Sequence, residues 1–161
     1  MAMDRDGKRT VERAETAVSL DSRLLEKVEK GFDCAVERAA EALRAAAQDA
    51  DIGDRFGAAL AAVLDAAAAQ PDLTQLCLVE APGLGSNALA RKDAGLQQFV
   101  DLLDNELAAA RGGQAPPLVS EMIVGGIYEV VQRTARAGDI QDAPELADQL
   151  RQLWLPALRG N

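Results

Sequence analysis

The residues that could carry acid–base, nucleophilic or metal chemistry are few in this chain, and histidine is absent. Without histidine, the chain lacks His-based acid–base catalysis, Ser-His-Asp and Cys-His nucleophile systems, and imidazole metal ligands. The two cysteines, Cys34 and Cys77, form no CxxC pair, so neither a disulfide framework nor a zinc site is predicted. Paired carboxylates such as Asp49 and Asp51 fall at helix ends and are expected to be solvated. We therefore expect no enzyme, no metal and no cofactor.

The segment PGLGS at residues 82–86 has only a superficial resemblance to a phosphate-binding loop. It lacks the P-loop lysine and the GxGxxG spacing, and it follows a helix, so a helix–helix connection is favoured. Just before it, Glu80 ends an apolar helix and has two interpretations: an ion pair with Arg91 or Lys92, or a polar contact to a ligand in an apolar cavity. Cys77, in the same helix, is expected to behave as a small buried hydrophobe.

Composition limits the class of protein. The 161 residues are 48% apolar and 27% charged, which predicts one folded domain. The net charge of −9 and pI near 4.5 oppose binding to nucleic-acid phosphates. The N-terminus has no apolar signal region, and the longest apolar stretch, Leu60–Ala69, carries Asp65 and is too short to span a bilayer. These features predict a cytoplasmic protein without membrane contact.

The elements that must position these residues are predicted to be helices only. Alanine makes up about a fifth of the chain and β-branched residues are few, so the fold class is all-α. Residues 1–20 are weakly patterned and are expected to form a flexible tail, with a helical domain over 21–161. Apolar spacings of three and four with N-cap, proline and glycine signals predict about six helices. They cover Ser22–Ala46, Ile52–Gln70, Leu73–Ala81, Ser86–Ala110, Leu118–Ala137 and Pro144–Leu158.

Three glycines fall inside these helices. Gly31 is expected to weaken or bend the first long helix, at a cost of about 1 kcal/mol relative to alanine. Gly125 and Gly126 lie in Leu118–Ala137, whose polar residues occupy a restricted arc and leave a broad apolar sector. Close approach of another helix would offset their cost. That helix belongs either to the same chain or to a second subunit.

Three segments in their order resemble the regulatory domain of TetR/AcrR-type transcriptional regulators. They are Leu73–Lys92, the VGGIYEVV motif at 124–131, and Arg136–Leu146 with the Leu/Trp helix that follows, and the likeness covers roughly Leu25–Arg159. The resemblance implies an all-α domain whose last two long helices pair with those of a second subunit into a four-helix interface. It also implies an apolar cavity for a small hydrophobic effector. Effector binding would move the helix that connects to the DNA-binding domain, here the one starting near Ser22.

The N-terminal DNA-binding head of that family has no counterpart in this sequence. Within Met1–Leu20 there is no helix-turn-helix spacing, no aromatic residue precedes Phe32, and seven Lys and Arg are balanced by seven Asp and Glu through residue 30. We expect either a regulatory domain cut from a longer protein or a family member that lacks the head. Specific DNA binding would then require a helix-turn-helix outside this chain. The alternative function is a stand-alone dimeric helical interaction protein that does not bind DNA.

The inward positions of the middle helices give the expected ligand contacts. They are Phe32, Phe56, Leu60, Cys77, Phe99 and Met122, with Glu80 or Tyr128 as the polar contact. The alternative is that the same residues fill a solid core.

A homodimer is expected through the last two long helices, burying more than roughly 2,000 Å². The expected interface residues are Val119, Ile123, Gly126, Ile127, Val130, Leu146, Leu150, Leu153 and Trp154. Because a charge at its centre would be buried and unpaired, Ile127→Glu is expected to dissociate the dimer.

Overall fold

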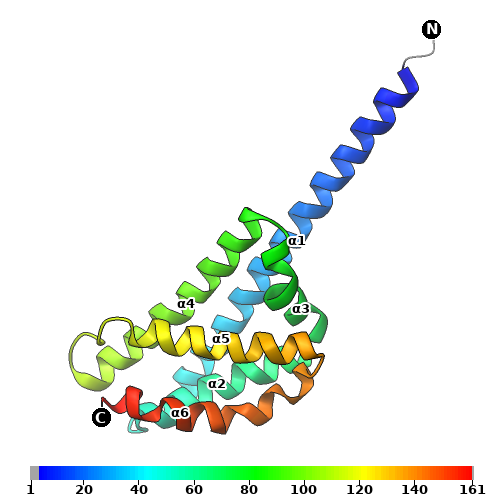
Figure 1. The fold of residues 1–161 in the computed structure, drawn as a ribbon. Helices are drawn as coiled ribbons and strands as arrows, with labels where there is room; N and C mark the ends of the chain where they lie inside the picture. The colour runs from blue at the N-terminus through cyan, green and yellow to red at the C-terminus, as the bar shows by residue number, and fades with distance from the viewer. Residues whose placement is uncertain (1–3, 161) are drawn as a thin grey trace.

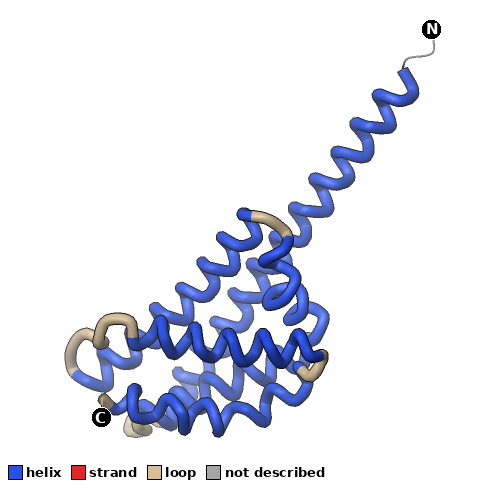
Figure 2. Tube along the Cα trace, viewed as in Figure 1, coloured by secondary structure: helices blue, strands red, loops and turns tan. Residues whose placement is uncertain are grey.

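The computed structural model describes the backbone of residues 4–160, with side chains for Thr16 and from Val18 onward. These residues form six α-helices and no strand, which confirms the all-α prediction (Figure 1, Figure 2). A π-helical turn and two 3₁₀ segments complete the fold. The elements are α1 (Asp4–Ala45), α2 (Ile52–Ala69), α3 (Pro71–Gln75), η1 (Leu76–Glu80), η2 (Ala81–Gly83), α4 (Ser86–Arg111), α5 (Val119–Ala137), η3 (Ile140–Leu146) and α6 (Ala147–Arg159).

The first helix is much longer than the sequence predicts. It begins at Asp4, so the expected start at Asp21 or Ser22 is wrong, and residues 4–20, expected as a tail, are helical. The Ser22 hydroxyl does not cap a helix end. It donates a hydrogen bond to the carbonyl of Val18 one turn earlier, a bond that is compatible with a continuous helix. The N-terminal part of α1 projects away from the other helices (Figure 1).

The expected third helix, Leu73–Ala81, is divided into three short segments. Pro71 lies in the first turn of α3, where its missing N–H costs nothing. The chain then widens into the π-helical turn η1 and tightens into the 3₁₀ turn η2. At the next boundary the N-cap of α4 is Gly85, with a φ of 98°, whereas Ser86 was expected to be the cap. The turn before α4 requires a positive φ, and glycine adopts this conformation more readily than other residues.

The largest hydrophobic core joins α2, α4, α5, η3 and α6. Five residues in it are at most 1% exposed: Leu64, Leu107, Ile123, Ala143 and Leu158. Two smaller clusters join α1 to the rest of the molecule. One packs Val28 and Phe32 against η1 and α4, and the other consists of small or medium residues between α1 and α2.

Gly31 has a packing role that the sequence did not indicate. A Cβ built at this position would lie 2.5 Å from the Sγ of Cys77 and 3.4 Å from a methyl of Leu73. Any larger residue would collide with the α3–η1 segment. The glycine therefore permits close approach of two segments, and the helix continues through it to Ala45.

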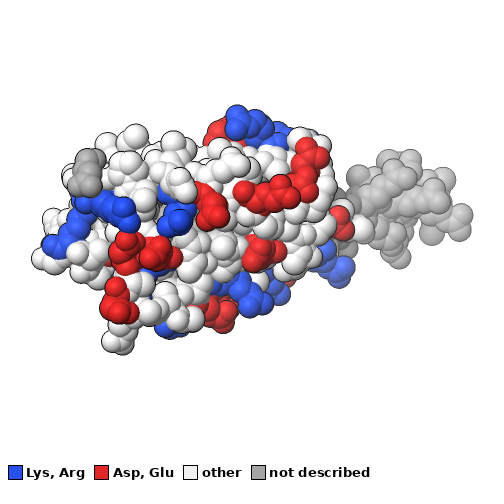
Figure 3. All heavy atoms as spheres, turned by 90° about the horizontal axis from the view of Figure 1, so that it is seen from below, with Lys and Arg blue, Asp and Glu red and all other residues white. Residues whose placement is uncertain are grey.

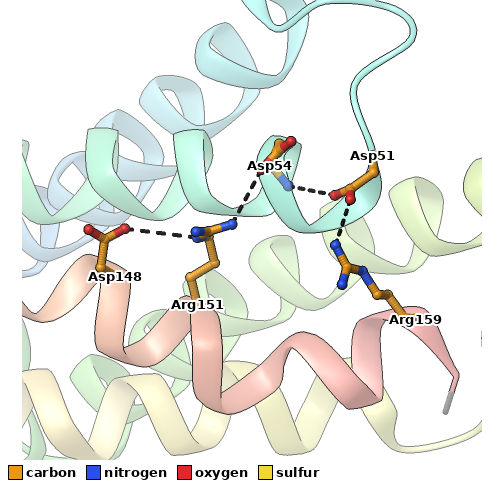
Figure 4. Close-up of polar contacts among 5 residues, drawn as sticks. All are labelled: Asp51, Asp54, Asp148, Arg151 and Arg159. Atoms are coloured by element: carbon orange, nitrogen blue, oxygen red, sulfur yellow. Dashed lines mark hydrogen bonds and ion pairs between the residues drawn. The ribbon is translucent and has the colours of Figure 1, made fainter.

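Helix α6 is fixed to the N-terminal end of α2 by charged side chains (Figure 4). Asp51 caps α2 by accepting from the N–H of Asp54 (3.0 Å), and its other oxygen pairs with Arg159 (2.6 Å). In the first turn of α2, Asp54 pairs with Arg151, which is also within 3.9 Å of Asp148. These contacts hold the pKa of the Asp51 carboxyl below its ordinary value, chiefly through the Asp54 N–H and then through Arg159.

Candidate ligand-binding cavity

A cavity of about 190 Å³ lies among α1, α2, the α3–η1 segment, α4 and α5. Its wall is almost entirely apolar. On α1 and α2 much of the wall consists of small residues, which leave the space open: Gly31, Ala35, Ala39, Ala59 and Ala66. An apolar cavity of about 150 Å³ holds one benzene molecule. This cavity therefore has room for a ligand of one or two rings, below the roughly 300 Å³ at which pockets for drug-sized molecules begin.

Six of the eight residues predicted to contact a ligand line this cavity. They are Phe32, Phe56, Leu60, Cys77, Phe99 and Tyr128. The placement of Met122 is wrong: its side chain is 63% exposed, because the inward face of α5 is formed by its neighbour Ile123 and by Ile127. Glu80 is exposed and also lies outside the cavity wall. Its two expected partners pair elsewhere, Arg91 with Glu29 and Lys92 with Asp93.

One edge of the cavity carries a polar arrangement built around the carbonyl of Leu78. In a regular helix this carbonyl would accept from the residue four positions later, but that residue is Pro82, which has no N–H. The side-chain amide of Gln132 donates to it instead (2.6 Å), with the hydroxyl of Tyr128 at 3.4 Å. The same amide nitrogen lies 3.0 Å from the Tyr128 oxygen.

Gln132 is the residue that sequence reasoning missed. Gln132 is one of the polar residues that occupy a restricted arc of the helix, yet it is only 6% exposed. The available signal was Pro82, because a proline in or just after a helix leaves the carbonyl four residues earlier without a backbone donor.

Tyr128 is the polar group that α5 presents at the cavity. Burial raises the pKa of its hydroxyl, so the group keeps its proton at neutral pH and can donate. The ammonium of Lys92 lies 5.3 Å from the centroid of the ring, within range of a cation–π contact.

Glu106 also lines the cavity but is paired. Its Oε2 accepts from Arg55 Nε at 2.8 Å, and both side chains are about one-fifth exposed. The bond raises the pKa of Arg55, which therefore stays protonated. The chemistry of the wall thus suits an apolar ligand with at most one or two polar atoms. Within the described part of the chain, no group of three or more Cys, Asp or Glu residues could hold a metal ion.

Comparison with known proteins assigns no family. No family model matches the chain, and neither the curated proteins nor the solved structures give a match. Among the described residues, no helix has both the length and the apolarity needed to cross a bilayer.

Several residues expected at a dimer interface are used within the chain. Ile123 and Leu150 are buried in the main core, and Ile127 lines the cavity. A Cβ at Gly126 would lie 2.7 Å from the indole of Trp154, so this glycine serves packing of α5 on α6 of the same chain. The broad apolar sector of α5 is therefore largely explained by two intramolecular neighbours, the core and α6. Because Ile127 lines the cavity of its own chain, Ile127→Glu would place a charge there and is not a test of a dimer interface.

The outer face of α5 and α6 still exposes large apolar side chains. Leu118 and Met122 are each 63% exposed and Leu153 is 66% exposed, while Val119, Val130, Leu146 and Trp154 are half-buried. A Cβ at Gly125 would meet no described atom within 4 Å. The indole Nε1 of Trp154 is buried without a hydrogen-bond partner among the described residues.

Proposed function

We propose that this chain is the ligand-binding and dimerisation domain of a TetR-like transcriptional regulator, and that its ligand is a small hydrophobic effector. The observation that carries the proposal is the apolar cavity of about 190 Å³ bordered by five helical segments. It lies among the middle helices, where the resemblance in the sequence predicts an effector site.

Helix α1 supports the regulatory part of the proposal. Its C-terminal half contributes Gly31, Phe32, Ala35 and Ala39 to the cavity wall, and its N-terminal half leaves the body of the molecule (Figure 1). A ligand that presses on this wall would therefore act on the helix that, in the proposed regulator, leads to the DNA-binding domain. The chain itself is proposed not to bind DNA specifically, because acidic and basic side chains are interspersed on the face shown in Figure 3 and the net charge is −9.

The proposed dimer uses the outer face of α5 and α6. Met122 and Gly125 on α5, and Leu153 on α6, flank the contact between Gly126 and Trp154. Large apolar side chains exposed on neighbouring helices are typical of an interface with a second copy. The same surface favours the alternative of a stand-alone helical interaction protein, which would dimerise without binding a ligand.

Ligand binding is tested with indole, a two-ring apolar probe, by thermal unfolding. Binding to the folded state at 100 times the Kd adds about 2.7 kcal/mol of stability. We expect indole to raise the Tm of the wild-type chain and to lose most of that effect in Ala35→Leu, which fills the cavity. Ala45→Leu, at an exposed position of the same helix, is the matched control and should respond like wild type. An equal response of Ala35→Leu and wild type would place indole outside the cavity.

Dimerisation is tested by light scattering at micromolar concentration. We expect twice the chain mass of 17.0 kDa for wild type. The double variant Met122→Glu/Leu153→Glu should be monomeric, because it places four charges in the proposed interface. The control Leu84→Glu/Leu89→Glu changes two residues that are about 40% exposed on η2–α4 and should remain dimeric. A wild-type mass near 17.0 kDa would refute the dimer.

A further inference from the structure

The aromatic side chains of this chain are concentrated around the cavity. The sequence has three phenylalanines and one tyrosine, and all four line the cavity wall: Phe32, Phe56, Phe99 and Tyr128. Each comes from a different helix, α1, α2, α4 and α5 in turn. Contacts between aromatic rings raise affinity by about two- to tenfold per pair beyond the effect of the apolar area that they bury. The wall is therefore suited to an aromatic molecule.

The packing of the fold holds these rings in place. A Cβ built at Gly95 would lie 2.7 Å from Cδ1 of Phe32, so the ring of Phe32 occupies space that a side chain on α4 would fill. Phe99 packs against the same cluster, and Phe56 is buried in the main core. Rings that are already ordered lose little conformational entropy when a ligand binds.

Two hydroxyl groups in the wall have partners inside the protein. The Thr74 hydroxyl donates to the carbonyl of Ala67 (2.9 Å). The Tyr128 hydroxyl accepts from the side-chain amide of Gln132 (3.0 Å) and contacts the Leu78 carbonyl at 3.4 Å. A ligand that offered a hydrogen bond to either hydroxyl would compete with these internal contacts.

The other polar side chains of the wall also offer little to a ligand. Of the described residues that line the cavity, Glu106 alone is charged, and Arg55 Nε donates to it at 2.8 Å. Gln70 is exposed to solvent, and Cys34 and Cys77 carry thiols, which are weak hydrogen-bonding groups. A hydroxyl buried without a partner lowers affinity by about 5–150-fold. Ligands with polar or ionised groups are therefore disfavoured.

We propose that the ligand of this cavity is an aromatic hydrocarbon of one or two rings that carries no hydrogen-bonding or ionised group. Its size is set by the volume of about 190 Å³, and its chemistry by a wall of aromatic rings whose polar neighbours are already paired. This inference rests on the proposed function, because it specifies the chemical class of effector for the same cavity.

The exclusion of polar groups is tested with toluene and phenol, which have the same ring and the same number of non-hydrogen atoms. The Kd of each follows from the rise in Tm of the full chain with ligand concentration. We expect toluene to bind at least about tenfold more tightly, because the phenol hydroxyl would be buried without a partner. Phenol binding as tight as that of toluene would show a hydrogen bond from the wall and would overturn the proposal.

The preference for an aromatic ring is tested with toluene and methylcyclohexane, which share one carbon skeleton. Since the two differ in hydrophobicity, each affinity is compared with the partition of that compound from water into hexane. On this scale we expect toluene to be favoured by about two- to tenfold. Equal affinities on the same scale would overturn the aromatic class, because the rings of the wall would then add nothing beyond apolar contact.

The position of the ligand is tested with the two alanine variants of α1. Ala35→Leu, which fills the cavity, should lose most of the response to toluene, and Ala45→Leu should respond like wild type. Circular dichroism checks the fold of both variants. An unchanged response of Ala35→Leu would place toluene outside the cavity and overturn the proposal.

Failure of this inference is separable from failure of the proposed function. Indole binding that depends on Ala35, together with phenol binding as tight as that of toluene, would leave the effector cavity and overturn only the hydrocarbon class. If neither indole nor toluene gives a response that depends on Ala35, both proposals are overturned.

Discussion

The two sides of this molecule are packed differently. On the side of α5, η3 and α6, large side chains such as Leu107, Ile123 and Leu158 are at most 1% exposed and fill the core. On the side of α1, small residues such as Gly31, Ala35 and Ala39 share the cavity wall with Phe32 and Leu43, and about 190 Å³ stays open. The same all-helical architecture thus combines a solid core with a cavity, and the small residues on α1 and α2 contribute to the open space. We expect the core around α5, η3 and α6 to contribute most of the stability of the fold, and the cavity beside α1 to contribute less.

The sharpest test of this contrast is to remove the same atoms on each side. Leu107→Ala, in the solid core, should lower the free energy of unfolding by about 2–5 kcal/mol, since it opens a new cavity. Leu102→Ala removes a half-buried side chain that already faces the open space, and should cost only about 1–2 kcal/mol. Urea unfolding of both variants measures the difference. Equal losses would show that the cavity side is as tightly packed as the core.

The hydrogen bonds of Gln132 and Tyr128 to the Leu78 carbonyl should contribute less to the free energy of unfolding than Leu107 does. Gln132→Leu leaves the Leu78 carbonyl without its nearest donor, because Pro82 cannot supply one, and should destabilise by about 1–3 kcal/mol. Tyr128→Phe removes the 3.4 Å contact with this carbonyl and the 3.0 Å contact with the Gln132 amide, but it leaves the bond from Gln132 to the carbonyl, so it should cost less. Urea unfolding of the two variants ranks them. If Tyr128→Phe is the more damaging variant, Gln132 is not the group that satisfies this carbonyl.

The smallest effect is expected where α6 meets α2 at the surface, and it depends on pH. The pKa of Asp51 lies below its ordinary value of 3.8 in the folded state, so its contribution to stability is complete above that pH and is lost as the pH falls through the lowered folded value. Asp51→Asn keeps an N-cap but not the charge. We expect it to be less stable than wild type at pH 7, by an amount that shrinks as the pH falls below 3.8. Asp49→Asn, just outside the network, is the control, and a gap that does not shrink with falling pH would contradict the assignment.

The ends of the helices were predicted best where the chain carries strong local signals. Asp51, Gly112 and Gly138 each adjoin a predicted helix end that the structure confirms or shifts by one residue. At Pro71 the structure starts α3 two residues before the predicted Leu73. The start of α1 was missed for the opposite reason. Its first turns carry no break strong enough to end a helix, and the Ser22 hydroxyl, which resembled a cap, bonds to the carbonyl of Val18 instead.

The site was only partly predictable, because periodicity identifies an apolar face but not its neighbour. It placed Phe32 and Phe56 correctly toward the middle helices. On α5 the apolar residues span most of the circumference, so the pattern could not tell that Met122 faces outward and Ile123 inward. The position of Gln132 depends on a carbonyl that is distant in sequence, at Leu78, and no local pattern records such a pairing.

The length of α1 has a mechanical consequence. Its 42 residues form one continuous rod of about 63 Å at 1.5 Å per residue. The stretch from Gly31 to Leu43 that borders the cavity spans about 18 Å, whereas the arm from Gly31 out to Asp4 spans about 40 Å. A rotation of the helix about a point near Gly31 would therefore move Asp4 about twice as far as it moves Leu43, at the other end of the cavity wall. In the proposed regulator the helix would act as a lever, and a small adjustment around a bound effector would become a displacement about twice as large at Asp4.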